Sequence, residues 1–169
     1  MGVKQMDGTA VAIISVVVSG LVGIATPYLA SRAARRQQEL EIRVEWEREV
    51  RDVLDRGARL LEAAFWSLDR AYRAEQSHDG AGHELFADSV ERRLPAMSRG
   101  GARLAVRLGT GSDAVVHYDD TQRLLRLLSD RVQAGDIAVG ALVNTPEWED
   151  AVAAQKRYLD SAQRIVGLG

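Results

Sequence analysis

The sequence predicts an all-α protein, in which an N-terminal transmembrane helix continues into a charged stalk and then into a cytoplasmic bundle of about four helices. Residues 9–31 form an unbroken, uncharged and largely apolar run. Beyond that run, apolar residues recur at helical spacing in segments separated by glycine and proline. No stretch alternates apolar and polar residues over a length that predicts a strand. The expected organisation is a short extracytoplasmic tail over residues 1–8, a transmembrane helix over 9–31, a charged helical stalk over 32–45 and the bundle over 46–169.

The run over residues 9–31 is long enough to cross a bilayer as a helix. A helix rises about 1.5 Å per residue, so a hydrocarbon core about 30 Å thick needs roughly 20 apolar residues. The run reads TAVAIISVVVSGLVGIATPYLAS, and only a helix satisfies the backbone polar groups of a single segment in lipid. A cleaved signal peptide is disfavoured, because Lys4 is offset by Asp7 and the run ends in arginines. A wholly buried core helix, which is also apolar all round, is the other alternative.

Positive charge just after the run predicts its orientation. Arg32, Arg35 and Arg36 follow the span, whereas the preceding tail is neutral on balance. The positive-inside rule then places the N-terminus outside a bacterial inner membrane and the C-terminal domain in the cytoplasm. Tyr28 suits the headgroup boundary, and the three arginines can reach lipid phosphates. We therefore expect these four residues to anchor the chain at the membrane surface.

Small residues recur on one face of the predicted span. Ser15, Ser19 and Gly23 are spaced by four, and small residues at this spacing let two membrane helices approach closely. Serine and glycine are also tolerated anywhere in a span, so the pattern has an ordinary interpretation. It predicts transmembrane helix packing, and with it a homo-oligomer, as one option.

A continuous helix is expected from Arg32 to Arg73, because this stretch contains no proline. Its upper part has little apolar face and predicts a solvated stalk. Its lower part carries an apolar stripe wide enough to bury in a bundle. The stripe consists of Trp46, Val50, Val53, Gly57, Leu60 and Ala64, widened by Leu54, Leu61, Phe65, Leu68 and Tyr72.

A loop over Gln76–Gly82 precedes a second helix, which is expected over His83–Leu108. Pro95 and the pair Gly100–Gly101 are expected to bend or split it. The apolar stripe of this helix consists of Phe86, Val90, Leu94, Met97, Leu104, Ala105 and Leu108.

The chain breaks again at Gly109–Ser112, where Ser112 or Asp113 can cap a third helix that reaches Val132. Residues 135–144 predict either a short helix or a loop packed on the core. The last helix has a strong start signal, with Thr145 as cap followed by Pro146. The expected apolar stripes are Tyr118, Thr121, Leu124, Leu125, Leu128 and Val132 in the third helix, and Trp148, Val152, Gln155, Leu159, Ala162 and Val166 in the last.

Composition and charge exclude several function classes. The chain has no cysteine, which excludes disulfides, a thiol nucleophile and a cysteine metal site. Its net charge is −2, and residues 1–36 carry Lys4 and three arginines against Asp7, so the remainder is acidic. Because duplex binders present a basic face, no nucleic-acid partner is expected.

The sequence offers few signals of a catalytic site. Neither a Walker loop, a G-x-S-x-G elbow nor an H-E-x-x-H pair is present. The remaining candidates are His78, His83 and the pair His117 with Asp120, beside Asp119. A metal site needs three or more converging ligands, and paired acids on a helix are more simply solvated. We therefore expect no cofactor, no metal and no catalytic residue.

The residues VSGLVGIATP of 18–27, followed by Ala33–Arg36 and a charged helix, resemble the uncharacterised small single-pass membrane proteins of actinobacteria. The resemblance implies location and topology, with no activity to carry over. The expected function is a non-enzymatic, membrane-anchored interaction or scaffold module that binds a protein partner or its own copies. The alternative is a membrane-active effector, holin-like or defence-type, whose oligomerised spans permeabilise the membrane.

Overall fold

The computed structural model describes the backbone of residues 8–77 and 80–167, and the side chains of residues 31–32, 34–77 and 80–167. Every regular element within these residues is helical and none is a strand, which confirms the all-α prediction. The elements are α1 (Gly8–Gln76), α2 (Gly82–Leu108), α3 (Asp113–Gln133), the short 3-10 helix η1 (Val139–Asn144) and α4 (Pro146–Gly167).

The chain divides into two compact units, Met1–Trp46 and Glu47–Gly169. The first contains the N-terminal part of α1, and the second contains the rest of α1 with all later elements. In the described part of the chain, no helix combines the length and the apolar character needed to cross a membrane. The side chains of residues 9–30, on which the predicted span depends, lie outside the described residues.

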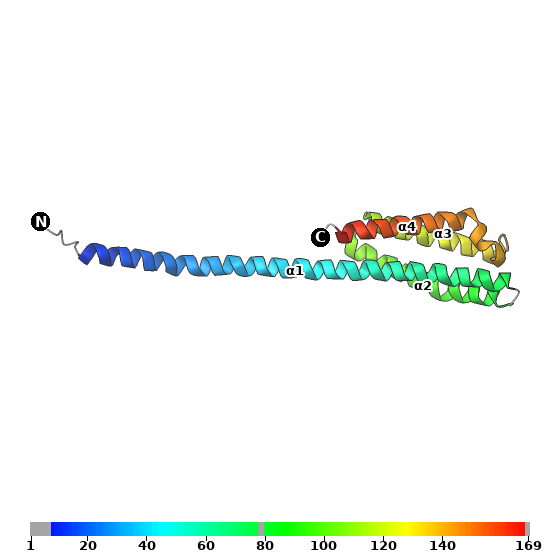
Figure 1. The fold of residues 1–169 in the computed structure, drawn as a ribbon, viewed down its shortest axis with the longest axis horizontal. Helices are drawn as coiled ribbons and strands as arrows, with labels where there is room; N and C mark the ends of the chain where they lie inside the picture. The colour runs from blue at the N-terminus through cyan, green and yellow to red at the C-terminus, as the bar shows by residue number, and fades with distance from the viewer. Residues whose placement is uncertain (1–7, 78–79, 168–169) are drawn as a thin grey trace. The chain divides into compact units, whose positions relative to one another are not determined.

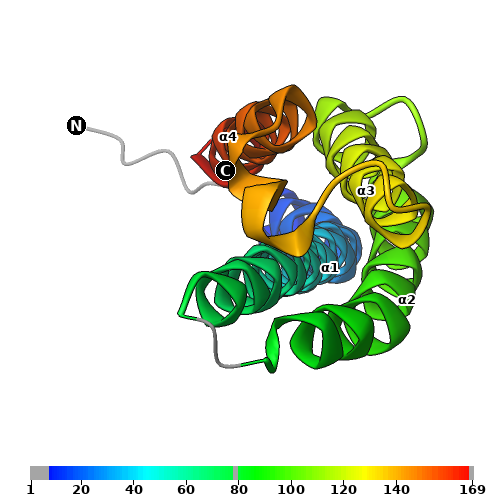
Figure 2. The ribbon, with the colours of Figure 1, turned by 90° about the vertical axis from the view of Figure 1, so that its right-hand side faces the viewer.

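The second unit is a bundle of four antiparallel helices. Residues 47–76 of α1 are followed by α2, α3 and α4, each running against the one before it (Figure 1). Viewed from the end, the four helices surround a common core, and η1 crosses the end where α1 finishes and α4 begins (Figure 2). Gln76 joins these elements by donating a hydrogen bond of 2.6 Å from Nε2 to the carbonyl oxygen of Gly140.

The α1 core stripe is confirmed in the main, but its centre lies one residue away from the expected line. Apart from Phe65, the buried residues of α1 are spaced alternately by four and three: Val50, Leu54, Gly57, Leu61, Ala64, Leu68 and Ala71. Val53 and Leu60 flank this seam, and Trp46 is half exposed. Continued towards the N-terminus, the same spacing reaches the charged residues Glu47 and Arg43, so Val50 is the first residue of the buried seam.

Pro95 and the following glycines were expected to bend or split the second helix, and the split is excluded because α2 continues through them. Pro95 and Glu91 are both exposed, so the proline and the residue whose carbonyl it leaves without a helical donor lie on the outer face of the bundle. Gly100 and Gly101 are buried. They allow close packing, since a Cβ on Gly100 would lie 2.6 Å from Leu60 Cδ1.

The third helix and the stretch after it follow the prediction in outline. Every residue of the expected α3 stripe is buried or half-buried. Ser112 occupies the N-cap position, but its side chain makes no capping hydrogen bond. The two alternatives for residues 135–144 resolve to the helix η1, whose Val139 and Leu142 are buried.

The stripe expected for the last helix lies one position away from the buried line. The buried face of α4 consists of Ala151, Ala154, Tyr158 and Ser161. Of the expected residues, Val152 and Leu159 are exposed, whereas Trp148, Gln155, Ala162 and Val166 are half-buried. The prediction from periodicity gave weight to the larger aliphatic residues, so it placed the buried stripe on the neighbouring line, which contains Val152 and Leu159.

Two buried tyrosines tie the four helices together by the same arrangement. Tyr158 on α4 donates a hydrogen bond of 2.7 Å to the carbonyl oxygen of Leu54 on α1, and Tyr118 on α3 donates one of 3.0 Å to Met97 on α2. Each hydroxyl also lies against the glycine that follows its acceptor residue by three positions. A Cβ on Gly57 would lie 2.4 Å from the Tyr158 hydroxyl, and a Cβ on Gly100 would lie 2.7 Å from the Tyr118 hydroxyl. The two rings meet edge to face with centroids 5.4 Å apart. Burial raises the pKa of both hydroxyls, which keeps them neutral.

Candidate interaction surfaces

The residues predicted to anchor the chain at the membrane surface lie on α1. Arg32, Arg35 and Arg36 are exposed, and at the helical rise they fall within about 6 Å along the axis. The side chains of Tyr28, Ser15, Ser19 and Gly23 lie outside the described residues. The described part of the predicted anchor is therefore a cluster of three arginines at one level of α1.

Directly after these arginines, α1 exposes four large apolar side chains. Three of them were not predicted to matter, and the fourth, Trp46, was expected in the buried stripe. The exposed fractions are 60% for Leu40, 60% for Ile42, 54% for Val44 and 50% for Trp46. The prediction treated this stretch as a solvated stalk with little apolar face. The signal that could have found them is the alternation of apolar and charged residues from Leu40 to Glu47. We call these four apolar residues the stalk apolar set.

A groove of about 530 Å³ lies between α1 and α2 and carries three arginines. Arg107 pairs with Glu49 at 2.9 Å, and Arg56 pairs with Asp52 at 3.6 Å. Two of the three guanidinium groups are thus already balanced by acids. The groove suits mixed-charge contacts with a protein better than capture of a polyanion.

A groove of about 370 Å³ lies between α1 and α4 and is more apolar. Leu54, Ala58, Leu159 and Val166 line it, with Arg51 among the charged residues at its edge. It results from the register of α4, since Leu159 lies beside the buried line rather than in it.

A third groove, of about 510 Å³, runs beside α3, and most of the residues that line it are charged or polar. Asp119, Arg123 and Asp130 are among its lining residues. Across to α2, Gln122 donates a hydrogen bond of 2.9 Å to the hydroxyl of Ser98, which also accepts one from Arg126. Partial burial raises the pKa of Asp119, and the carboxylate of Asp120 adds to the rise.

The structure does not bring the histidine candidates into one site. His83, at the start of α2, pairs with Glu75 at 3.3 Å. His117 lies near the start of α3, at the opposite end of the bundle, and α2 alone spans about 40 Å between these ends. His117 is half-buried, and its Nδ1 has no hydrogen-bond partner among the described residues. His78 lies outside the described residues, and within them no group of three or more histidine or acidic side chains could hold a metal ion.

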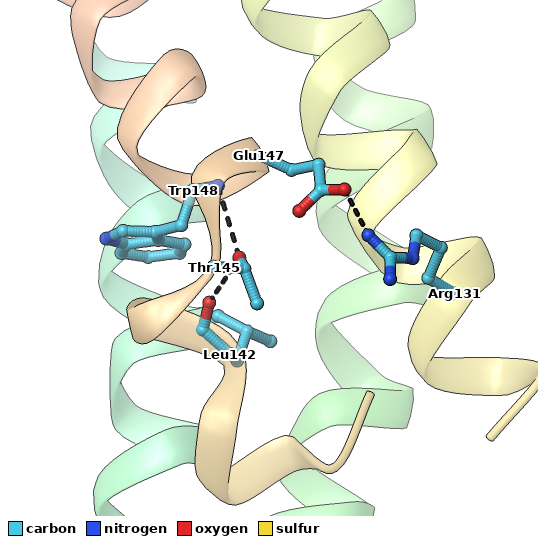
Figure 3. Close-up of polar contacts among 5 residues, drawn as sticks. All are labelled: Arg131, Leu142, Thr145, Glu147 and Trp148. Carbon is cyan, nitrogen blue, oxygen red and sulfur yellow. Dashed lines mark hydrogen bonds and ion pairs between the residues drawn. The ribbon is translucent and has the colours of Figure 1, made fainter. Parts of the chain in front are cut away.

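The start of α4 contains the most enclosed ion pair among the described residues (Figure 3). Glu147 in the first turn bonds to Arg131 on α3, and its side chain is 17% exposed. Thr145 caps the same turn by accepting a hydrogen bond of 3.3 Å from the backbone nitrogen of Trp148. The Thr145 hydroxyl in turn donates one of 2.8 Å to the carbonyl oxygen of Leu142. This cluster connects η1, α3 and α4, so its role is to hold the end of the bundle together.

No protein-family model, curated protein or solved structure matches this chain. The resemblance to small single-pass membrane proteins of actinobacteria therefore stays a prediction.

Proposed function

We propose that this protein is a membrane-anchored, non-enzymatic interaction module that presents a helical bundle at the inner face of a bacterial cell membrane. The observation that carries the proposal is the uncharged run of residues 9–31, which is followed at once by Arg32, Arg35 and Arg36. A run of this length offers about the number of apolar residues that a bilayer requires. The exposure of the three arginines on α1 supports a role at the headgroup level.

The surface of the bundle supports binding to a protein. Trp66 is 62% exposed, and the guanidinium of Arg70 lies 5.7 Å from the centroid of its ring. Tryptophan and arginine are the residues most enriched at the centres of protein interfaces. The separation of His83 from His117 supports the non-enzymatic part, because general acid–base chemistry needs converging groups.

Membrane fractionation of the full chain tests the anchor. We expect the chain in the membrane pellet, resistant to high salt and released by detergent. Replacing Val17 and Leu21 by Asp should move it to the supernatant, because each central charge costs about 2.5–3.5 kcal/mol of insertion. Gln38→Asp, outside the span, is the matched control and should leave the chain in the membrane. A full-length wild-type chain in the supernatant without detergent would contradict the proposal.

Topology can be tested with single cysteines, because the chain has none of its own. In intact spheroplasts, a membrane-impermeant maleimide should label Gln5→Cys and leave Thr110→Cys unlabelled. After lysis it should label both. The reverse pattern would contradict the proposed orientation.

Controlled expression separates the interaction module from the alternative, a membrane-active effector. An interaction module should leave the membrane potential unchanged when the chain is induced. A rapid loss of potential on induction, abolished by the Val17 and Leu21 double substitution, would support the effector instead.

A further inference from the structure

The stalk apolar set forms two separate faces on one helix. Residues four apart lie on the same side of a helix, so Leu40 pairs with Val44 and Ile42 with Trp46. At 3.6 residues per turn the two pairs are about 160° apart around the axis. Each face is at least half exposed, so two opposite sides of this segment expose large apolar side chains to solvent.

The charges between the two faces are arranged by sign. By the same geometry, Arg43 lies between the faces on one side of the helix, while Glu41 and Glu45 lie between them on the other. When two parallel helices pair about a two-fold axis, the opposite flanks of the two helices meet. The Arg43 flank of one copy then faces the Glu41 and Glu45 flank of the next, and this holds for either apolar face.

We infer that the stalk apolar set is covered by further copies of this chain, packed parallel, so that each stalk has two neighbours. The charge pattern selects the occupant, because a parallel copy supplies a carboxylate flank for Arg43 at each face. A lipid surface does not fit, since Glu41 and Glu45 would meet anionic headgroups. The parallel orientation rests on the proposed function, because chains inserted in one membrane with one topology must point the same way.

Two neighbours per stalk implies an assembly larger than a dimer. Anchoring in a membrane favours such an assembly, because it confines the copies to a surface and fixes their axial level. The interface per pair is small. Assembly should therefore be strong in the membrane and weak once the chain is diluted in detergent.

Disulfide formation in native membranes tests the inference, since the chain contains no cysteine. Leu40→Cys, Val44→Cys, Ile42→Cys and Trp46→Cys should each form a disulfide-linked dimer on mild oxidation, because a parallel pair places equal positions opposite one another. Glu41→Cys and Glu45→Cys, between the faces, are the matched controls and should give at least five-fold less dimer. Equal yields at all six positions, or none at the four apolar ones, would overturn the inference.

Two neighbours are tested by combining one cysteine from each face. Val44→Cys with Trp46→Cys should give a ladder beyond the dimer, whereas each single variant stops at the dimer. A double variant that also stops at the dimer would overturn the two-neighbour arrangement. An antiparallel pair would instead place position 42 of one chain opposite position 46 of the other. Crosslinking that occurs only when Ile42→Cys and Trp46→Cys chains are mixed would therefore overturn the parallel orientation.

Recovery of the chain in the membrane pellet distinguishes failure of the stalk assembly from failure of the proposed membrane anchor. Chains that remain in the membrane without crosslinking overturn only the stalk assembly. In that case, poor maleimide labelling of the apolar positions in the lysate would indicate that another surface covers the stalk, such as the chain's own bundle. Chains recovered in the supernatant overturn the anchor itself.

Discussion

At the scale of single residues, the bundle depends on close contacts between tyrosine hydroxyls and glycine. The space that a Cβ would take at Gly57 is occupied by the hydroxyl of Tyr158, which bonds to Leu54. A buried hydroxyl deprived of its acceptor costs about 1–3 kcal/mol. Gly57, and Gly100 beside Tyr118, are therefore needed for packing and do not break their helices.

We expect Gly57→Ala to lower the free energy of unfolding by about 1–3 kcal/mol, although alanine raises helix propensity by about 1 kcal/mol. Tyr158→Phe alone should cost about 1 kcal/mol. The double variant should be more stable than Gly57→Ala alone, because the clashing oxygen is gone. Urea denaturation followed by circular dichroism measures all three.

Gly111→Ala is the control for this series, because nothing lies within 4 Å of a Cβ at that position. It should change stability by less than about 0.5 kcal/mol. Strictly additive effects of Gly57→Ala and Tyr158→Phe would contradict the contact between the two residues.

Asp119 gives the bundle a pH dependence of defined sign. Partial desolvation, together with the carboxylate of Asp120, raises the pKa of this solvent-accessible carboxyl, so the folded state holds its proton more tightly than the unfolded state does. Stability from this group is fully present below the ordinary aspartate pKa and is lost as the pH rises through the raised value. We expect Asp119→Asn to unfold at a higher temperature than the wild type at pH 7. The difference should vanish near pH 3 in thermal melts, and a difference that grows on acidification would contradict the assignment.

At the scale of elements, the start of α4 combines a cap with an ion pair. Thr145 supplies the capping hydroxyl and Glu147 places a carboxylate near the positive end of the helix. The sequence predicted both, because a threonine before a proline and acidic residues is a strong start signal. The partner of Glu147 was beyond prediction, because Arg131 belongs to another helix.

We expect Thr145→Ala to destabilise the bundle by about 1 kcal/mol, since the backbone N–H of Trp148 loses one of its two acceptors, the Thr145 hydroxyl. Thr145→Ser keeps the hydroxyl and should recover most of the loss. Equilibrium denaturation at pH 7 measures both. Equal destabilisation by the two variants would show that the threonine methyl group, and not the cap, matters.

Where element predictions failed, packing was the cause. Periodicity placed Val152 and Leu159 in the α4 core, but the structure buries Ala151, Ala154 and Tyr158 on the neighbouring line. The alternation of apolar and charged residues over 40–47 is also compatible with a short strand. These residues are nevertheless helical within α1. Neighbouring helical turns on both sides and helix-forming leucine, glutamate and arginine outweigh the alternation.

At the scale of the whole molecule, the core belongs to the second unit. Every buried apolar residue among the described ones lies at Val50 or later. The tyrosine hydrogen bonds, the central rings and the α4 cluster also join residues of this unit. The bundle thus has the contacts of an independently folding domain.

We expect a fragment of residues 47–169 to fold alone, with one cooperative unfolding transition. It should remain in the supernatant, whereas the full chain fractionates with membranes. Circular dichroism and urea denaturation of the purified fragment check this. A fragment that is unfolded or aggregated at neutral pH would show that the bundle depends on residues before Glu47.

The sequence by itself determined the helical class, the loops that precede the second and third helices, and the start of the last helix. These follow from local properties, such as glycine and proline placement, capping chemistry and the spacing of apolar residues. Only the tertiary structure decided which of two adjacent lines on α4 is buried, why Gly57 and Gly100 must lack a side chain, and which helix pairs with Glu147. Those choices depend on the volume and polar groups of residues far away in the chain, which no local pattern records.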